Sequence, residues 1–182
     1  MPRSHAAAGP PGTGYPSPMP SHRLDALFTS DLPGLRSLRQ HLHANPELSW
    51  QEHNTQHVLR TQLEGLGLAP RTIAGTGLVV ETRPDLPVSL ALRADMDALP
   101  ITEETGLDYS SCNLGCMHAC GHDGHMAMVV GVARALVRAK APVNVRLFFQ
   151  PAEEGGLGAE RMIREGVLEG VPEVYGLHNW PQ

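Results

Sequence analysis

Apolar segments of strand length alternate with helical patterns through the second half of the chain, and this alternation strongly restricts the possible folds. Four segments have strand character: residues 77–82, 88–93, 143–149 and 174–177. A helical pattern over residues 124–140 separates the second segment from the third. Strands and helices in alternation predict an α/β layered domain with a largely parallel sheet. In such sheets the chemistry gathers outside the carboxyl ends of the strands.

Two further helices are predicted ahead of these strands. The first begins at Asp31, where leucines recur at steps of three and four residues, and it has Pro33 in its first turn. It should end before Pro46, because the residue that precedes a proline is disfavoured in a helix. The second helix begins at an N-cap, Ser49, which would form a capping box with Glu52.

The ends and faces of the helices follow from the same kind of pattern. The second helix should end at about Glu64, because Gly65 and Gly67 follow it. A short helix is predicted over residues 158–164. The helix over 124–140 is strongly amphipathic, and the face that we expect to be apolar carries Met128, Val132, Ala135, Leu136 and Ala139.

Composition separates a tail from a domain. Residues 1–22 are rich in Pro, Gly, Ser and Ala without apolar periodicity, so we expect them to be disordered. Residues 23–182 are predicted to form one domain. We find no secretory signal and no apolar run long enough to span a bilayer, and the odd count of three cysteines fits a reducing compartment. A cytoplasmic protein is therefore expected.

Charge and aromatic content bear on the class of partner. The formal net charge is −5, which favours neither nucleic acid nor an anionic membrane as partner. Only 4% of the residues are aromatic, so platforms on which bases could stack are not expected. Neither nucleic acid nor a membrane is therefore expected as a partner.

One nine-residue stretch, 117–125, holds three histidines, a cysteine and an aspartate. Cys120 and His122 are two residues apart, so in an extended segment their side chains would project from the same face. A thiolate beside an imidazole suits a borderline-soft divalent ion such as zinc. The stretch therefore predicts a metal site, although a small buried cysteine and a core histidine are the structural alternatives.

Two later stretches supply further ligand types, each at the end of an apolar run. Glu153 and Glu154 follow the strand over 143–149, and His178 follows the strand over 174–177. Adjacent residues of an extended segment point in opposite directions. We therefore expect one glutamate to bind metal while the other faces the reacting water.

Five motifs give the chain a family resemblance. They are the segments 41–49, 92–100, 117–125, 151–156 and 176–181. On these motifs the chain, from about Leu24 to its end, resembles the metal-dependent amidohydrolases of the M20 peptidase family. The resemblance is to the branch that contains hippurate hydrolases, N-acyl-amino-acid aminoacylases and auxin-conjugate hydrolases. It implies a three-layer α/β/α, zinc-exopeptidase-like catalytic domain.

The resemblance also implies roles for individual residues. Cys120, His122, Glu154 and His178 match metal ligands, and Glu153 matches the general base and acid. The implied cofactor is a pair of divalent ions, with Zn, Mn, Co and Ni as candidates. The implied reaction is hydrolysis of the amide bond of N-acyl amino acids, of the hippurate or N-acetyl type, by metal-activated water.

Several motif residues have more than one possible role. In the wider family a His-x-Asp pair occupies the position of Asp95 and Asp97, and here Asp95 replaces the histidine. Orientation of a ligand histidine is the expected role of either aspartate. Asp123 could instead cap a helix. The roles of His118 and His125 stay open.

Relatives in this family continue well beyond the position that matches His178. Full-length relatives are expected to be homo-oligomers. We expect the lid or dimerisation domain and the carboxy-terminal half of the catalytic domain to be absent here, so that the chain is a truncated, amino-terminal part. Two alternatives to the amidohydrolase stay open: a dipeptidase or aminopeptidase on the same scaffold, and an inactive metal-binding fragment.

Overall fold

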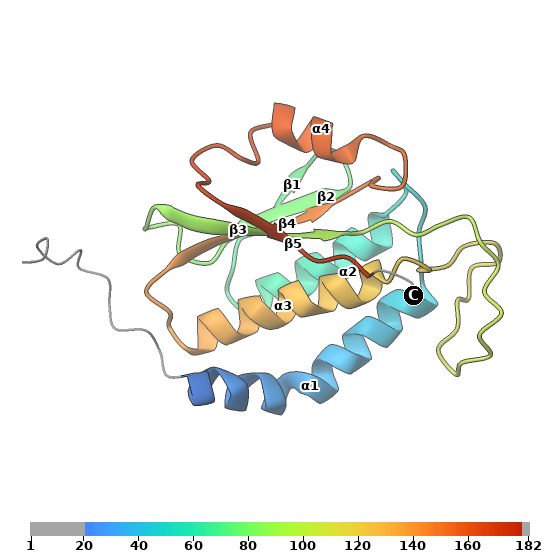
Figure 1. The fold of residues 1–182 in the computed structure, drawn as a ribbon, viewed down its shortest axis with the longest axis horizontal. Helices are drawn as coiled ribbons and strands as arrows, with labels where there is room; N and C mark the ends of the chain where they lie inside the picture. Colours follow the sequence, from blue (N-terminus) through green and yellow to red (C-terminus); the bar gives the residue numbers. More distant parts are fainter. Residues whose placement is uncertain (1–20, 180–182) are drawn as a thin grey trace, which may run out of the picture.

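The computed structural model describes residues 21–179 and contains four helices and five strands in that range (Figure 1). The chain order alternates as the sequence predicts, with an additional short strand, β1, ahead of the first predicted one. In chain order the elements are α1 (Ser21–Ala44), α2 (His53–Glu64), β1 (Arg71–Ile73), β2 (Gly77–Glu81), β3 (Val88–Asp95), α3 (His122–Arg138), β4 (Asn144–Gln150), α4 (Gly158–Arg164) and β5 (Val174–Gly176).

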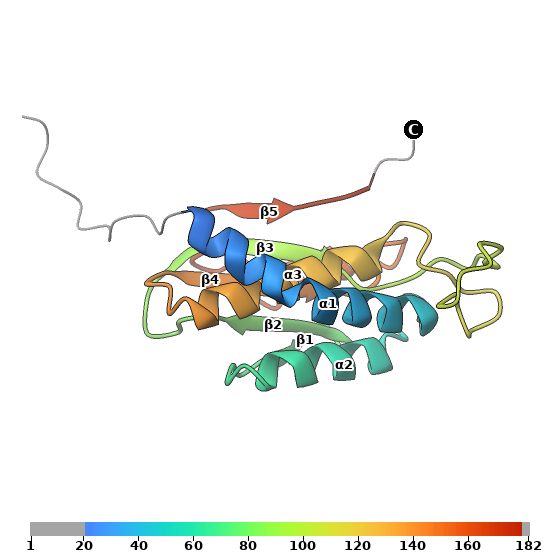
Figure 2. The ribbon, with the colours of Figure 1, turned by 90° about the horizontal axis from the view of Figure 1, so that it is seen from below.

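The five strands form one sheet in the order β1-β2-β4-β3-β5, and Figure 2 shows β5 at one edge of it. β3 is parallel to both of its neighbours, β4 and β5. β2 is antiparallel to both β1 and β4, so the sheet is mixed. The predicted parallel arrangement holds for the three strands β3, β4 and β5, whose carboxyl ends therefore meet at one edge.

The α/β/α layering is confirmed. Helices α1, α2 and α3 lie on one face of the sheet and α4 lies on the other (Figure 1). The larger apolar cluster joins the three helices to the sheet through residues such as Leu42, Leu59 and Phe149. The smaller cluster lies under α4 and includes Ile73 and Met162. Both faces of the sheet are therefore covered, as buried parallel strands require.

Helix α1 begins earlier than predicted. It starts at Ser21, so Pro33 lies inside the helix and not in its first turn. Asp31 is buried against α3, where its carboxylate pairs with Arg138 at 2.9 Å and with Arg134 at 3.4 Å. These ion pairs join α1 to α3 close to the proline. The helix ends at Ala44, ahead of Pro46, as predicted.

The expected disordered tail, 1–22, falls almost entirely outside the described residues. Ser21 and His22 are described and belong to helix α1, so the boundary was placed too late. Within the described part of the chain, no helix is both long and apolar enough to cross a membrane.

Two predictions about helix chemistry are wrong. The N-cap of α2 is Glu52, with no side-chain capping bond, because the Ser49 hydroxyl donates to Asp97 instead, at 2.7 Å. The predicted apolar face of α3 is wrong at Met128, which is 46% exposed, whereas Ala135 is buried and Leu136 packs against the core. The buried side of this helix carries Met126, Val130 and Ala133, which pack against α1 and the sheet. The short helix α4 and the end of α2 at Glu64 agree with the sequence.

Candidate metal centre

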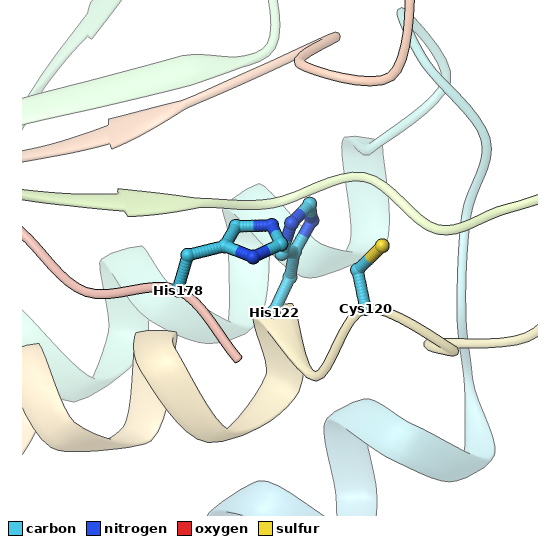
Figure 3. Close-up of side chains that lie close together, drawn as sticks. All are labelled: Cys120, His122 and His178. Atoms are coloured by element: carbon cyan, nitrogen blue, oxygen red, sulfur yellow. The ribbon is translucent and has the colours of Figure 1, made fainter. Parts of the chain in front are cut away.

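The predicted site residues gather at the carboxyl edge of the parallel strands. β4 leads into the turn that carries Glu153 and Glu154, and β5 leads into His178. His122 is the first residue of α3, and Cys120 lies just before it. Figure 3 shows the side chains of Cys120, His122 and His178 projecting into one space. The convergence follows from the topology, because parallel neighbours end at the same edge.

Cys120 and His122 do not lie in an extended segment. Gly121, between them, has φ +79° and serves as the N-cap of α3. A β-carbon built on Gly121 would lie 2.0 Å from Nδ2 of Asn179, so both the backbone angle and the close approach favour glycine. The two side chains meet because the chain turns sharply, and the expected extended geometry is wrong.

The possible ligand atoms form two groups of three, and both groups contain His122. Cys120, His122 and His178 make the first, which we call the thiolate triad. His122, Glu153 and Glu154 make the second, which we call the carboxylate triad. Within each triad the ligand atoms lie within 4.8 Å of one another. The four predicted ligands and the predicted base are therefore neighbours around one histidine.

The two glutamates face the same side, against the expectation that adjacent residues diverge. They lie in a turn, and Ala152 before them has φ +49°. Each has a carboxylate oxygen in the triad of His122. The rule of opposite directions applies to extended chains, and β4 ends at Gln150, before the pair begins.

His122 is held so that one ring nitrogen faces the site. Its Nδ1 donates to the carbonyl oxygen of Asp97 at 2.8 Å, which leaves Nε2 as the unprotonated atom that faces Glu154 Oε1 at 4.0 Å. Both Nε2 and that carboxylate oxygen are buried and make no hydrogen bond within residues 21–179. Buried polar atoms usually have partners. Two such atoms facing each other fit a bound cation between them.

The electrostatics of the site also suit a cation. Burial raises the pKa of the Cys120 thiol to about 11, with Glu154 and Glu153 adding to the effect. Burial and the neighbouring carboxylates of Asp95 and Glu154 raise the pKa of Glu153. Crowded acids disfavour their charged forms in this way, and a divalent ion reverses the effect by favouring thiolate and carboxylate. The donor set of sulfur, imidazole and carboxylate suits zinc and related metals.

The two aspartates at and just after the end of β3 take different positions. The Asp97 carboxylate accepts from the Glu154 backbone N–H at 2.9 Å, and its carbonyl orients His122 as described above. Asp97 therefore contacts two candidate ligands. Asp95 accepts from Arg93 Nε at 2.8 Å instead. The expected orienting role fits Asp97, through its main chain as well as its side chain.

His118, His125 and Asp123 are buried beside the site. Burial lowers the pKa of His118 to about 4, and neither of its ring nitrogens makes a hydrogen bond within the described residues. The ring of His125 lies 5.9 Å from that of His122 and 5.8 Å from that of His178, centroid to centroid. Asp123 does not cap α3, because its carboxylate accepts from Arg39 at 2.6 Å.

Sequence reasoning missed a buried charge network next to Asp123. His43 contacts Asp123 through Nδ1 at 2.9 Å and Glu103 through Nε2 at 3.1 Å. Arg39 also reaches Tyr109, at 3.2 Å. The network ties α1 and the loop after β3 to the start of α3, which carries His122. The partners are 60 to 84 residues apart in sequence, so no local sequence pattern predicts these contacts.

Acid should destabilise the protein through Glu103. Burial raises the pKa of Glu103, but hydrogen bonds from Thr105, the Ser111 backbone and His43 lower it by a larger amount. The resulting pKa is about 2. Because the folded-state pKa of Glu103 lies below its ordinary value of 4.5, the stabilisation is complete above about pH 4.5 and disappears as the pH falls toward 2. We expect Glu103→Gln to flatten the dependence of melting temperature on pH in this window. The neighbouring Glu104→Gln should leave the dependence unchanged, and equal profiles for Glu103→Gln and wild type would contradict the assignment.

The comparisons with known proteins agree with this geometry. A family model described as peptidase family M20/M25/M40 matches residues 91–182. An N-acetyl-L-cysteine deacetylase of Bacillus subtilis is 44% identical over 151 residues, which are 81% of this chain and 36% of the relative. The IAA-amino acid hydrolase ILR1-like 5 of Arabidopsis thaliana is 42% identical over 144 residues, 78% of this chain and 33% of the relative.

A solved structure shows the same fold. The YXEP protein of Bacillus subtilis, described as a dinuclear metal-binding peptidase of the M20 family, superposes with a TM-score of 0.77 at 40% identity. The match covers 87% of this chain and 45% of that protein. The chain thus spans about a third of the length of the two curated relatives and less than half of this structure.

Proposed function

Because the chain belongs to peptidase family M20/M25/M40, we propose that it carries the metal site of a hydrolase that cleaves the amide bond of N-acyl amino acids. The observation that supports this most directly is the pair of ligand triads sharing His122. The names of two relatives, a deacetylase of N-acetylcysteine and a hydrolase of IAA-amino acids, point to the same class of substrate. Hydrolysis of hippurate is one case within this class.

The cofactor that we propose is a pair of divalent ions. Cys120, His122 and His178 would hold one, and Glu154 would hold the other together with groups close to it. Bound there, the ions would polarise the amide carbonyl and lower the pKa of a water molecule. Among Zn, Mn, Co and Ni, the sulfur and nitrogen ligands of the site favour zinc.

Glu153 is the residue that we assign to proton transfer. It lies beside a cavity of about 240 Å³ that is also lined by Arg93, Asp95 and His178, whereas the oxygen of Glu154 that faces His122 is buried. The pKa of Glu153 is raised and so lies nearer to neutral pH. Such a pKa suits a group that first acts as a general base and later as a general acid. Glu153 would take a proton from the attacking water and give it to the leaving amine.

The remaining residues of the chain position these groups. Asp97 holds the His122 ring through its carbonyl and the Glu154 backbone through its carboxylate. Arg93 Nη2 lies 3.9 Å from a Glu153 oxygen, and Arg93 Nε donates to Asp95, so the guanidinium is a fixed cation at the rim of the cavity. The products would be a carboxylic acid and a free amino acid.

The proposal is tested with the purified chain loaded with Zn²⁺ or Co²⁺ and offered three substrates: N-acetylcysteine, N-benzoylglycine and a dipeptide with a free amino terminus. We expect release of free amino acid from N-acetylcysteine and N-benzoylglycine, loss of this activity with a chelator, and its return when metal is added back. Metal binding should release protons and tighten as the pH rises, because Cys120 and the carboxylates must be deprotonated to bind.

Two outcomes would contradict the proposal. Hydrolysis confined to a dipeptide with a free amino terminus would identify a peptidase on the same scaffold. Binding of metal without turnover of any of the three substrates would identify a metal-binding chain without this activity. Isothermal titration calorimetry in buffers of different ionisation enthalpy measures the proton release independently of turnover.

A further inference from the structure

Glu52 is a buried carboxylate with no cationic partner in the described part of the chain. Its exposed fraction is 0%, and no ion pair within residues 21–179 includes it. One carboxylate oxygen accepts from the Thr76 hydroxyl at 2.5 Å, and the other accepts from the Ala152 backbone N–H at 2.8 Å. Burying a carboxylate is costly unless its hydrogen bonds are satisfied. Both oxygens of Glu52 are used, and one of them holds the residue that directly precedes Glu153.

Ala152 has a backbone conformation that needs support. Its φ of +49° lies in the left-handed region, which is unfavourable for a residue with a β-carbon. This conformation turns the chain out of β4 and brings both glutamates to the side of His122. The bond from Ala152 to Glu52 joins this turn to the N-terminus of α2, which the rest of the core holds in place.

The same short segment supports the turn at other points. Trp50 packs against it so closely that a β-carbon on Gly156 would lie 2.7 Å from the indole nitrogen. Ser49 donates to the Asp97 carboxylate, which in turn accepts from the backbone of Glu154. Residues 49–52 therefore contact both ends of the turn. Among these four residues, Glu52 is the one that accepts a hydrogen bond from the backbone N–H of Ala152, at the start of the turn.

We infer that Glu52 is a positioning residue: through the Ala152 N–H it fixes the turn that aims Glu153 and Glu154 at His122. This inference rests on the proposed metal site. Glu52 acts on the carboxylate triad, whose two glutamates lie in the turn. It does not act on the thiolate triad, because Cys120 and His178 come from the loop before α3 and from the end of β5. Loss of Glu52 should therefore weaken one metal ion and spare the other.

The test is a titration of the whole chain with Co²⁺, followed by visible absorption and by the charge-transfer band between thiolate and cobalt. In Glu52→Ala we expect the affinity for one of two ions to fall by about 10- to 100-fold, the range found when a group that orients a ligand is removed. The thiolate band of the other ion should stay at its wild-type intensity. A purely structural role would lower the melting temperature without this split.

Conservative and matched variants separate positioning from stability. Glu52→Gln should restore both affinities, because its amide oxygen can accept from Ala152 while its NH₂ group donates to Thr76. Glu52→Asp keeps the charge but is one methylene shorter, so we expect it to weaken the same ion. It provides the test if Glu52→Ala does not fold. Glu165→Ala is the control, since Glu165 accepts from the backbone N–H of Ala74, another alanine with positive φ, at 2.7 Å, away from both triads.

The outcomes are distinct. If Glu52→Ala or Glu52→Asp folds, by circular dichroism, and binds two ions with wild-type affinity, the inference is overturned while the metal site stands. If the wild-type chain itself binds no Co²⁺, the proposed metal site is wrong and the inference falls with it. Equal weakening by Glu165→Ala would also overturn the inference, because it would show a general response to lost stability.

Discussion

Replacement of Glu153 by glutamine should abolish hydrolysis and leave the metal content unchanged. The amide of glutamine has nearly the same shape as the carboxylate but cannot accept a proton from water or deliver one to a leaving amine. General acid–base catalysis contributes about 10²- to 10⁴-fold to a rate. We therefore expect turnover of N-acetylcysteine to fall by at least about 100-fold. Initial rates give the activity, and elemental analysis of the purified protein gives the metal content.

A matched control is available on the neighbouring helix. Glu160→Gln makes the same substitution on α4, where the side chain is exposed and pairs with Arg164. It should leave both rate and metal content at their wild-type values. If Glu153→Gln kept the wild-type rate, another group would have to be the base. If Glu153→Gln lost its metal instead, Glu153 would be a ligand and the assignment of the two glutamates would have to be exchanged.

Replacement of His122 by alanine should remove the metal ion that its Nε2 binds and weaken the binding of the neighbouring ion. His122 is the residue that the two triads share, and its Nε2 faces the site with no hydrogen-bond partner in the described residues. Binding of a ligand at 100 times its dissociation constant stabilises the folded state by about 2.7 kcal/mol. We therefore expect wild type to melt at a higher temperature with metal than without, and His122→Ala to show a smaller difference.

Two single-triad variants and a control sharpen this result. His178→Ala and Glu154→Ala each alter one triad, so each should keep part of the metal content and part of the metal-dependent rise in melting temperature. His57→Ala removes an exposed histidine of α2 and should behave like wild type. For each variant the melting temperature of metal-loaded protein is compared with that of metal-free protein. The stability lost by removing the side chain itself is the same in both and cancels. Retention of both ions by His122→Ala would refute the shared-ligand geometry.

The layered fold follows from local patterns. Strand β4 is a buried and largely apolar run, and the turn that carries Glu153 and Glu154 follows its end. Parallel neighbours deliver their ends to one edge, so the meeting of the Glu153–Glu154 turn with His178 could be anticipated from the order of the elements. The antiparallel pairing of β2 could not, because pairing partners are set by contacts between distant segments.

The errors have a common physical origin. Ser49 and Glu52 have the spacing of a capping box, but each side chain finds a tertiary partner, Asp97 for the first and Ala152 for the second. In the same way, Asp123 could cap a helix by its position, yet Arg39 and His43 bind it. Local propensity is worth about 1 kcal/mol at a cap. A charge-assisted bond in the interior can outweigh it.

The sequence by itself determined which residue types are present and where in the order of elements they occur: a thiol and an imidazole before a helix, and paired carboxylates and a further imidazole after the ends of apolar runs. Only the tertiary structure decided how they face one another. The positive φ angles at Gly121 and Ala152 turn the side chains of Cys120 and of the two glutamates toward His122. Those angles depend on bonds and close contacts to Asn179 and Glu52, which lie 58 and 100 residues away along the chain and come near only when the sheet and its helices have packed.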